Sequence, residues 1–372
     1  MESESSATGE SHPTFLPPSE LGTKDYWESY YERTLAYISI KNPRGKEKEH
    51  DFSDDDDDDD DYNHNDESED DDDDPGTSWF SEHKAPEKVL NFLTDESFPL
   101  APVNTNTNVD VETSQQEQSQ PCILDLGTGN GSMLALLRKG GFTGPMVGVD
   151  YSARSVELAR ELQRLRLEGR YSGTGTAAGD REHEDIVVAT ENGTNEAVPI
   201  SISTSNNNPG ETQYGKPEED ADAVRFEEWD ILSSTHALSK KELQDASRPR
   251  LDWFPYDRDG FDIVLDKGTF DAVSLSDEVV EDADQSGNGM VVRQRVCERY
   301  PIIARRLVRK GGFLVVTSCN WTEAELIRWF TDDVHDGDDD GRLSVWGRIE
   351  YPRFRFGGQE GQGVCTVCFQ KG

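Results

Sequence analysis

The chain has 372 residues, of which 33% are hydrophobic and 30% are charged, and its formal net charge at pH 7 is −39. A chain of this length can form one large domain with insertions or two domains, but so few hydrophobic residues exclude a packed core that includes the whole chain. The negative charge repels nucleic-acid phosphates and so disfavours a nucleic-acid substrate, and no apolar run reaches the roughly 18 residues of a membrane span.

The first ordered element that the sequence predicts is a helix over residues 19–42. Aromatic and aliphatic residues recur there at spacings of three and four, from Tyr26 to Ile38, and Thr23 can serve as the N-cap. Residues 1–18 are predicted to form a disordered tail. The start of this tail is acidic and polar and has no signal-peptide h-region, so we expect an intracellular protein.

Residues 43–75 form a low-complexity acidic segment. Between Asp51 and Asp74 it holds 17 acidic residues and no lysine or arginine. This composition cannot bury enough apolar surface to fold, so we expect a disordered insertion. Residues 76–372 should form the main domain, and further polar insertions are predicted near residues 100–120, 170–222, 237–259 and 277–289.

Strands alternate with helices along this main domain. The predicted strands cover residues 122–126, 146–149, 224–229, 261–265, 313–317, 345–351 and 363–369. One predicted helix begins near residue 133, and three more cover residues 152–168, 291–307 and 322–330. The alternation indicates an α/β fold with a seven-stranded, mostly parallel sheet and flanking helices, in which the last two strands form an antiparallel hairpin.

The first strand ends in the turn Asp125-Leu-Gly-Thr-Gly-Asn-Gly131. In an open α/β sheet, ligands bind beyond the carboxyl ends of the strands, and Gly127 and Gly129 allow a ligand to approach the backbone closely. Such a turn can hold a dinucleotide pyrophosphate, an S-adenosyl group or no ligand. Asp125 favours S-adenosylmethionine, because its carboxylate can bind the ammonium of a methionine moiety and would repel a pyrophosphate.

Further candidate ligand residues follow the second and third strands. Asp150 ends the second strand and can accept hydrogen bonds from both hydroxyls of a ribose, an arrangement that fits a dinucleotide equally well. Tyr151 can lie against an adenine ring. Trp229 and Asp230 end the third strand, where a carboxylate can accept a hydrogen bond from the adenine amino group.

The fourth and fifth strands end in residues that point to the reacting group. Asp266 should lie near the transferred group and orient an incoming ammonium, rather than act as a strong base. Lys267 either pairs with a neighbouring carboxylate or belongs to the site. Asn320 can line a substrate channel or cap the next helix. The seven histidines show no metal-ligand spacing, so no metal is expected.

Several motifs resemble one known family, the class I (seven-strand, Rossmann-like) protein-lysine methyltransferases that act on translation elongation factor 1-alpha. The matching pieces are Glu20-Leu-Gly-Thr-Lys-Asp-Tyr-Trp27, Trp79-Phe-Ser-Glu82, Ile123-Leu-Asp-Leu-Gly-Thr-Gly-Asn-Gly131, Gly148-Val-Asp-Tyr151, Asp266-Lys-Gly-Thr-Phe-Asp-Ala272 and Thr317-Ser-Cys-Asn-Trp321. The glycine turn is shared by many methyltransferases, whereas the Tyr26-Trp27, Asp266-Lys-Gly-Thr and Ser-Cys-Asn-Trp motifs are more specific. Two departures concern the substrate rim: Ser81 stands where the family has glycine, and the acidic segment separates two motifs.

The resemblance implies a cytoplasmic enzyme that uses S-adenosylmethionine to methylate a lysine side chain of elongation factor 1-alpha. We also expect the protein to be a monomer. The resemblance also implies that the N-terminal helix packs at the cofactor face, with Trp27 as a wall of the cofactor site. An alternative is an S-adenosylmethionine-dependent methyltransferase of another protein or of a small molecule.

Overall fold

The computed structural model describes residues 13–41, 80, 83–106, 120–171, 224–283, 291–332, 341–356 and 359–372. The acidic segment 43–75 lies outside these residues, as do most of the predicted insertions at 100–120 and 170–222. Within the described residues, no helix is both long enough and apolar enough to cross a membrane.

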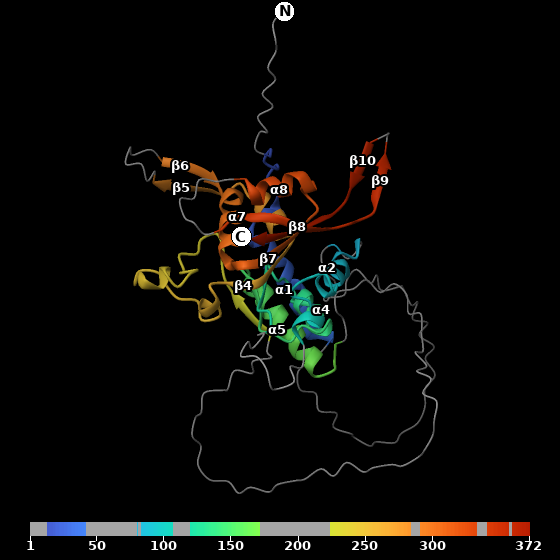
Figure 1. Ribbon diagram of the computed structural model, residues 1–372. Coiled ribbons are helices and arrows are strands. Elements are labelled where there is room, and N and C mark those ends of the chain that lie inside the picture. Colours follow the sequence, from blue (N-terminus) through green and yellow to red (C-terminus); the bar gives the residue numbers. More distant parts are fainter. Residues whose placement is uncertain are drawn as a thin grey trace, which may run out of the picture. The chain divides into compact units, whose positions relative to one another are not determined.

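A seven-stranded sheet forms the centre of the described domain (Figure 1). The strands are β1 (Ile123–Leu126), β2 (Met146–Asp150), β3 (Val224–Glu228), β4 (Phe261–Lys267), β7 (Val308–Ser318), β8 (Leu343–Ile349) and β11 (Cys365–Lys371). Their order is β3-β2-β1-β4-β7-β11-β8. The first five strands in this order run parallel to one another, and β11 is antiparallel to both β7 and β8. The predicted fold class is therefore confirmed, including the antiparallel pairing at the C-terminus.

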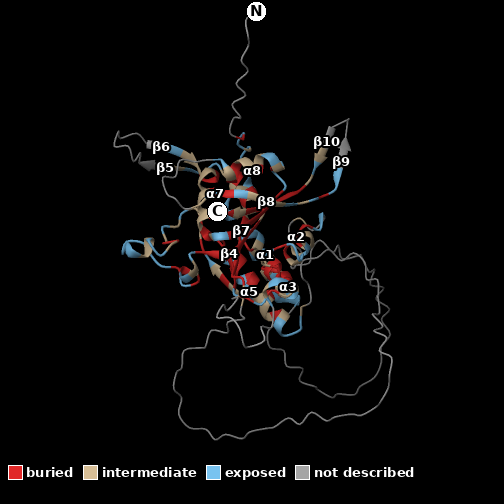
Figure 2. Ribbon diagram, viewed as in Figure 1, coloured by how far each residue is buried: buried red, intermediate tan, exposed pale blue. Residues whose placement is uncertain are grey.

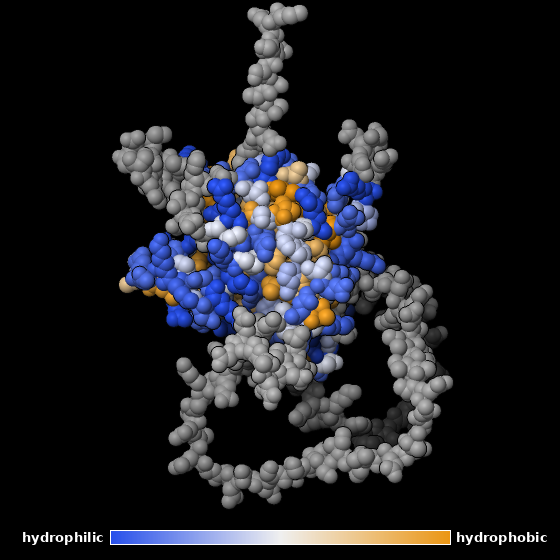
Figure 3. All heavy atoms as spheres, viewed as in Figure 1, coloured by the Kyte–Doolittle hydropathy of each residue, from blue (hydrophilic) through white to orange (hydrophobic). Residues whose placement is uncertain are grey.

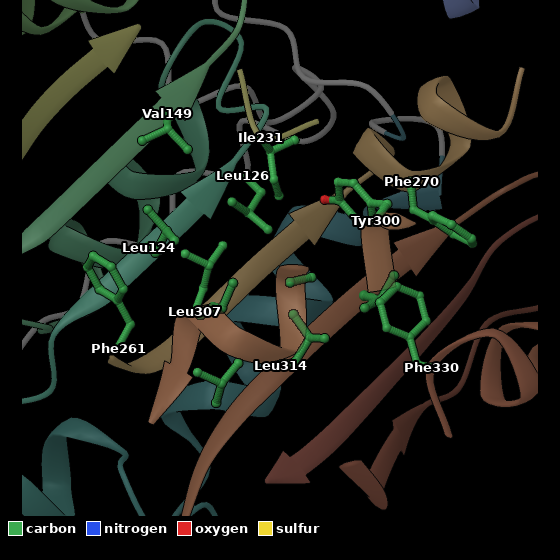
Figure 4. Packing of buried hydrophobic residues seen from close by; sticks show 14 of the residues in the cluster. Leu124, Leu126, Val149, Ile231, Phe261, Phe270, Tyr300, Leu307, Leu314 and Phe330 are labelled. Atoms are coloured by element: carbon green, nitrogen blue, oxygen red, sulfur yellow. The ribbon is translucent and has the colours of Figure 1, made fainter. Parts of the chain in front are cut away.

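Both faces of the sheet are buried, because side chains alternate between two hydrophobic clusters. On β1, Leu124 and Leu126 belong to one cluster and Ile123 to the other. On β7, Leu314 and Val316 pack on the first face, whereas Phe313 and Val315 pack on the second. This period-2 alternation is what a sheet covered by helices on both sides requires. Figure 2 shows the buried residues concentrated in the central elements, and Figure 4 shows part of the first cluster.

Helices cover the two faces in separate groups. The first face packs against α6 (Thr269–Ser274), α7 (Val296–Leu307) and α8 (Glu323–Thr331), and the second against α2 (Ala85–Thr94), α4 (Ser132–Lys139) and α5 (Ala153–Leu167). The short helix α3 spans Pro102–Thr105. The N-terminal helix α1 (Lys24–Lys41) packs through Ile38 against Leu158, Leu162 and Leu165 of α5.

The predicted helix starts are confirmed by their caps. Ser152 and Thr322 each accept a hydrogen bond from the backbone nitrogen three residues later, at the starts of α5 and α8. Thr23 accepts a 3.4 Å hydrogen bond from the backbone nitrogen of Tyr26 at the start of α1. Residues 20–22 form a 3-10 turn before that helix, so α1 begins later than predicted.

Two hairpins lie outside the main sheet (Figure 1). Strands β5 (Val279–Ala283) and β6 (Val291–Arg295) form one, and β9 (Arg353–Phe356) and β10 (Gln359–Gln362) form the other. The predicted helix over 291–307 is therefore wrong at its start, because residues 291–295 pair with β5 before α7 begins. β-branched Val291 and Val292 suit a strand, whereas the apolar spacing of three and four begins at Val296.

Two segments that were expected to lie outside the core pack against it. Residues 237–259 were predicted to be a polar insertion, but Leu251, Trp253, Phe254 and Tyr256 are buried in the first cluster. Four large apolar side chains outweigh the polar residues between them, because burying each one contributes roughly 1.5–3 kcal/mol. Within the predicted tail 1–18, Leu16 packs against the same cluster.

Candidate functional site

A cavity of about 820 Å³ opens at the carboxyl ends of the parallel strands, where strand order reverses between β1 and β4. Its walls come from the turn after β1, from the ends of β2 and β3, from α1, and from the segment that runs from Lys267 to Val280. Seven of the predicted site residues line it: Trp27, Gly127, Gly129, Asp150, Tyr151, Trp229 and Asp230. Asp125, Asp266 and Asn320 do not belong to the lining.

The glycine turn brings its backbone close to neighbouring side chains. Gly127 and Gly129 have φ values of +59° and +57°, in the left-handed region that favours glycine. A β-carbon at Gly127 would lie 2.2 Å from Oγ1 of Thr269, and one at Gly129 would lie 3.0 Å from the hydroxyl of Tyr31. The turn therefore requires glycine both for its conformation and for its space.

Asp125 lies beneath this turn and is buried. Its Oδ2 accepts a 2.8 Å hydrogen bond from Oγ1 of Thr128. Burial raises its pKa to about 6, while the Thr128 hydrogen bond and the positive charge of Lys267 oppose the increase. The carboxylate is thus placed behind the turn rather than on the cavity surface.

Asp150 joins the glycine turn to the start of α5. Its Oδ2 accepts hydrogen bonds from the backbone nitrogen of Gly129 at 3.1 Å and from Oγ of Ser155 at 2.7 Å, and its Oδ1 accepts one from the nitrogen of Ser152 at 3.0 Å. A carboxylate offers about four lone-pair sites, so roughly one remains for a ligand. Burial raises the pKa of Asp150, and these hydrogen bonds oppose the increase.

The end of β3 supplies another wall of the cavity. Nε1 of Trp229 donates a 3.0 Å hydrogen bond to Oγ of Ser234. Asp230 accepts hydrogen bonds from the nitrogens of Leu232 and Ser233 and a 2.6 Å bond from the Ser233 hydroxyl. These bonds fix the loop after β3 with the Asp230 carboxylate at the cavity edge.

Aromatic residues of α1 close the cavity opposite the strands. Trp27 is 7% exposed, and its Nε1 donates a 2.8 Å hydrogen bond to the carbonyl of Leu21. The Trp27 ring lies 5.9 Å from those of both Tyr30 and Tyr31, and all three residues line the cavity. Burial and the negative charge of Asp150 raise the pKa of Tyr31. The sequence motif identified Trp27, but the role of Tyr31 depends on how α1 packs over the sheet.

Asp266 was predicted to face the reacting group, and the structure corrects this. It is 1% exposed, and its Oδ1 accepts hydrogen bonds from the nitrogens of Thr269 at 2.9 Å and Phe270 at 3.2 Å. Its Oδ2 accepts a 2.8 Å hydrogen bond from the hydroxyl of Tyr300. Burial raises the pKa of Asp266 to about 7. Its carboxylate thus holds the start of α6 in place, and Thr269 lines the cavity instead.

Asn320 was predicted to line a substrate channel, and it too lies outside the cavity. The residues around it serve the junction between β7 and α6: Asp271 accepts hydrogen bonds from the Ser318 hydroxyl at 2.5 Å and from the Cys319 nitrogen at 2.8 Å. Trp321 is buried, and its Nε1 donates a 3.2 Å hydrogen bond to the Ser274 hydroxyl. The Ser-Cys-Asn-Trp motif therefore stabilises α6, which forms a wall of the cavity, and does not itself contact the ligand space.

Lys267 follows Asp266 and does line the cavity. Its Nζ lies 5.7 Å from the ring centroid of Phe80. Among the described residues, no carboxylate oxygen lies within ion-pair distance of it. Burial lowers its pKa, and the charges of Asp125 and Asp266 oppose the decrease. The sequence left open whether Lys267 pairs with a carboxylate or belongs to the site; in the structure the residue lines the cavity and forms no ion pair among the described residues.

Comparison with known proteins bears on the same part of the chain. Residues 118–171, which include β1, the glycine turn, β2 and α5, match a family model described as a methyltransferase domain. Protein-lysine N-methyltransferase EFM4 of Saccharomyces cerevisiae is 26% identical over 358 residues, which are 96% of each chain. EEF1A lysine methyltransferase 2 of Homo sapiens is 22% identical over 355 residues, which are 95% of this chain and 88% of that protein. The chain contains a methyltransferase domain.

Solved structures similar to this methyltransferase include N-methyltransferase NodS from Bradyrhizobium japonicum in complex with S-adenosyl-L-homocysteine. The match has a TM-score of 0.31 and 11% identity and covers 78% of this chain and 98% of that chain. An S-adenosylmethionine-dependent methyltransferase from Aquifex aeolicus matches with a TM-score of 0.32 and 12% identity, over 77% of this chain and 98% of that chain.

The cofactor of this methyltransferase is S-adenosylmethionine, and the residues present fit it. The glycine turn is too tight for any β-carbon at Gly127, which leaves backbone exposed to a ligand. The cavity volume of about 820 Å³ lies within the range of about 300–1,000 Å³ that is usual for small-molecule and cofactor sites. Within the described part of the chain, no group of three or more His, Cys, Asp or Glu residues is arranged to hold a metal ion.

Proposed function

We propose that this methyltransferase is a protein-lysine N-methyltransferase and that its substrate is translation elongation factor 1-alpha. The observation that carries the proposal is the similarity to the yeast and human lysine methyltransferases, which extends over 96% and 95% of this chain rather than over the cofactor-binding part alone. The alternative substrates are another protein or a small molecule. The residues of the cofactor site do not distinguish between these substrates, because each reaction would use the same cofactor.

Two ends of the cavity receive different parts of the cofactor in this proposal. The backbone of Gly127 and Gly129 approaches the methionine moiety, and the buried Asp125 attracts its ammonium. At the adenosine end, Asp150 accepts a ribose hydroxyl, Tyr151 and Trp229 flank the adenine, and Asp230 accepts its amino group. Trp27 covers the bound molecule from α1, on the side opposite the strands.

S-adenosylmethionine, when bound, supplies a methyl group on a positively charged sulfur. The enzyme's own residues must bring a neutral amine to that methyl, although the free lysine pKa is near 10.4. Two exposed carboxylates at the cavity, Asp277 and Glu278, attract the lysine ammonium. Asp266 positions α6 and hence Thr269, and the proton is released to water. Asp266 is thus a positioning residue rather than a group that contacts the substrate.

The proposal also includes a monomeric enzyme located in the cytoplasm. The formal net charge of −39 opposes a direct contact with nucleic acid. Figure 3 shows one face of the molecule, which is mainly hydrophilic with small hydrophobic patches. Light scattering after gel filtration tests the oligomeric state, and fractionation of cells tests the location.

The substrate proposal is tested with labelled S-adenosylmethionine and purified, unmodified elongation factor 1-alpha. Label should enter the factor, and peptide mapping should place it on one lysine. The variant Asp150→Asn, which loses the carboxylate that holds the turn, should transfer little label. The variant Glu157→Gln, at an exposed position of α5, should match the wild-type enzyme. If the wild type binds S-adenosylmethionine in calorimetry but leaves the factor unlabelled, the substrate proposal is wrong.

A further inference from the structure

Arg299 lines the cavity from α7 and is half-buried. Val296, three residues earlier on the same face of the helix, lines it too. Within the described residues, the Arg299 guanidinium makes no ion pair and no hydrogen bond. In a chain with 76 acidic and 37 basic residues, an arginine without a carboxylate partner at a cavity wall needs an explanation.

The other arginines of this region serve the fold. Arg295 donates hydrogen bonds to the carbonyls of Leu16, Ser274 and Ser276, and Arg306 forms an ion pair with Glu242. Arg299 differs from both, because it lines the cavity and its guanidinium has no hydrogen-bond or ion-pair partner among the described residues. A guanidinium presents five donors in a planar fork that matches a carboxylate or a phosphate, and an unmodified protein substrate offers the carboxylates of aspartate and glutamate.

Arg299 lies one helical turn after Val296, which contacts the segment that follows α6. Helix α6 begins beside that turn, where Oγ1 of Thr269 donates a 2.6 Å hydrogen bond to the carbonyl of Leu126. The helix has six residues, so its far end lies about 9 Å away at a rise of about 1.5 Å per residue. The segment after that end, from Ser276 to Val280, lines the cavity, and the carbonyl of Glu278 accepts a 3.1 Å hydrogen bond from the Val296 nitrogen.

The cavity wall formed by α7 and the segment 276–280 thus carries charges of both signs. Asp277 and Glu278 are exposed there, and neither carboxylate forms an ion pair with Arg299. The two carboxylates suit a cationic lysine, and the guanidinium suits an anion close to it.

We propose that Arg299 is a specificity-determining residue that binds an aspartate or glutamate side chain close to the target lysine of the protein substrate. The inference rests on the proposed lysine methyltransferase activity and deepens it, because it defines the substrate class as lysines with a nearby acidic residue. Electrostatic complementarity of this kind selects among substrates rather than adding to chemistry.

The test uses the full-length enzyme and a peptide library with a fixed central lysine and varied flanking residues. With labelled S-adenosylmethionine, the wild type should prefer peptides with aspartate or glutamate near the lysine. The variant Arg299→Ala should lose this preference, and Arg299→Glu should favour lysine or arginine at the same position. For a selected acidic peptide, KM should rise about tenfold or more in Arg299→Ala, the scale for losing a hydrogen bond between charged groups.

Binding measurements distinguish a contact of Arg299 with the peptide from a contact with the cofactor. The affinity for S-adenosylhomocysteine should be the same in Arg299→Ala as in the wild type, and fluorescence anisotropy should show weaker binding of the acidic peptide. The variant Arg154→Ala, which removes an exposed arginine of α5, should change neither, and equal melting temperatures exclude misfolding. Weaker S-adenosylhomocysteine binding with an unchanged peptide preference would assign Arg299 to the cofactor carboxylate and overturn the inference.

The two proposals can fail separately. If elongation factor 1-alpha stays unlabelled while the library shows an acidic preference that needs Arg299, the substrate proposal fails and this inference stands. If the factor is labelled but replacing each acidic residue near its modified lysine by alanine leaves KM unchanged, this inference fails and the substrate proposal stands. A wild-type enzyme without any acidic preference in the library also overturns it.

Discussion

The hydroxyl of Tyr300 on α7 donates a 2.8 Å hydrogen bond to Oδ2 of Asp266 at the end of β4, and both residues are buried. The ring of Tyr300 stacks on that of Phe270, with 5.6 Å between the centroids, and Figure 4 shows the two side chains next to each other. Through this bond, α7 is tied to the start of α6, which forms one wall of the cavity. The relationship makes Asp266 a structural support of the site and leads to a pH-dependent prediction.

Replacing Asp266 with asparagine should change how stability depends on pH. The folded-state pKa of Asp266, about 7, lies above its usual 3.8, so the folded protein holds this proton more tightly than the unfolded chain. The stability that the protonated Asp266 contributes is fully present below about pH 4 and is lost as pH rises through 7. Asp266→Asn lacks this titration, so its free energy of unfolding relative to the wild type should increase by about 2–3 kcal/mol between pH 5 and pH 8, at about 1.36 kcal/mol per pKa unit.

Urea unfolding at the two pH values measures the effect on Asp266. Tyr300→Phe is the matched control, because it keeps the carboxyl and removes a hydrogen bond that lowers its pKa. In that variant the loss of stability should extend to a higher pH. A difference between Asp266→Asn and the wild type that is the same at pH 5 and pH 8 would show that Asp266 does not titrate in this range.

Replacing Gly127 with alanine should remove most cofactor binding. The left-handed backbone costs an alanine roughly 1–2 kcal/mol, and the new β-carbon would lie 2.2 Å from Oγ1 of Thr269, so the turn must move. Calorimetry with S-adenosylhomocysteine should show at least a tenfold loss of affinity. Gly169 has φ +67° with no atom within 4 Å of an added β-carbon, so Gly169→Ala should lose a similar backbone energy and keep full affinity. Equal affinities in both variants would contradict the prediction.

Much of the sheet could be predicted from the sequence because β1, β2 and β4 contain short apolar runs that end at a glycine or a carboxylate. The hairpin β5–β6 could not, because its strands hold charged residues such as Glu281, Asp282 and Arg293 and pair only with each other. The burial of segment 237–259 could not be predicted for a different reason. Its buried aromatic residues show neither helical nor strand periodicity, and they pack into the core only because the sheet provides a surface for them.

The location of the site could also be predicted, because carboxyl ends of parallel strands meet at one edge of a sheet. The sequence does not predict which of the carboxylates at this edge face the ligand. Asp150 lines the cavity, whereas Asp266 turns toward Tyr300 and the α6 backbone. This choice depends on side-chain direction, which strand boundaries do not determine. Tyr31 and Arg299 were missed because they reach the cavity through the packing of α1 and α7, and no local pattern records that packing.

Replacing Trp27 with alanine should weaken cofactor binding by about tenfold or more. Removing a buried tryptophan side chain commonly costs 3–5 kcal/mol, and here it would remove the ring that packs against Tyr30 and Tyr31 and the hydrogen bond to Leu21. Trp27→Phe keeps a ring and loses only the hydrogen bond to Leu21, so its effect should be smaller. Calorimetry and thermal unfolding measure both.

Tyr37 provides the control on the same helix, because it lies outside the cavity lining and its ring contacts Lys41 at 4.5 Å. Tyr37→Ala should leave the affinity for S-adenosylhomocysteine unchanged. If Trp27→Ala bound as tightly as the wild type while remaining folded, α1 would not be a wall of the cofactor site.

The charge of Lys267 should set the pH range of cofactor binding through Asp125. Burial raises the pKa of Asp125 to about 6, and the Lys267 charge lowers it. Because the proposed attraction of the methionine ammonium needs the ionised carboxylate, affinity should fall as pH falls through 6. Lys267→Met removes the positive charge and raises the pKa of Asp125 further. The midpoint of the affinity loss should therefore move to a higher pH.

Calorimetry with S-adenosylhomocysteine from pH 5 to pH 8 follows this midpoint. Lys139→Met removes an exposed lysine of α4 and should leave the profile in place, whereas Asp125→Asn should bind weakly and without a transition near pH 6. Superimposable profiles for the wild type and Lys267→Met would show that the two charges are not coupled during binding. A transition that persists in Asp125→Asn would assign it to another group, of which Asp266, with a pKa of about 7, is the nearest candidate.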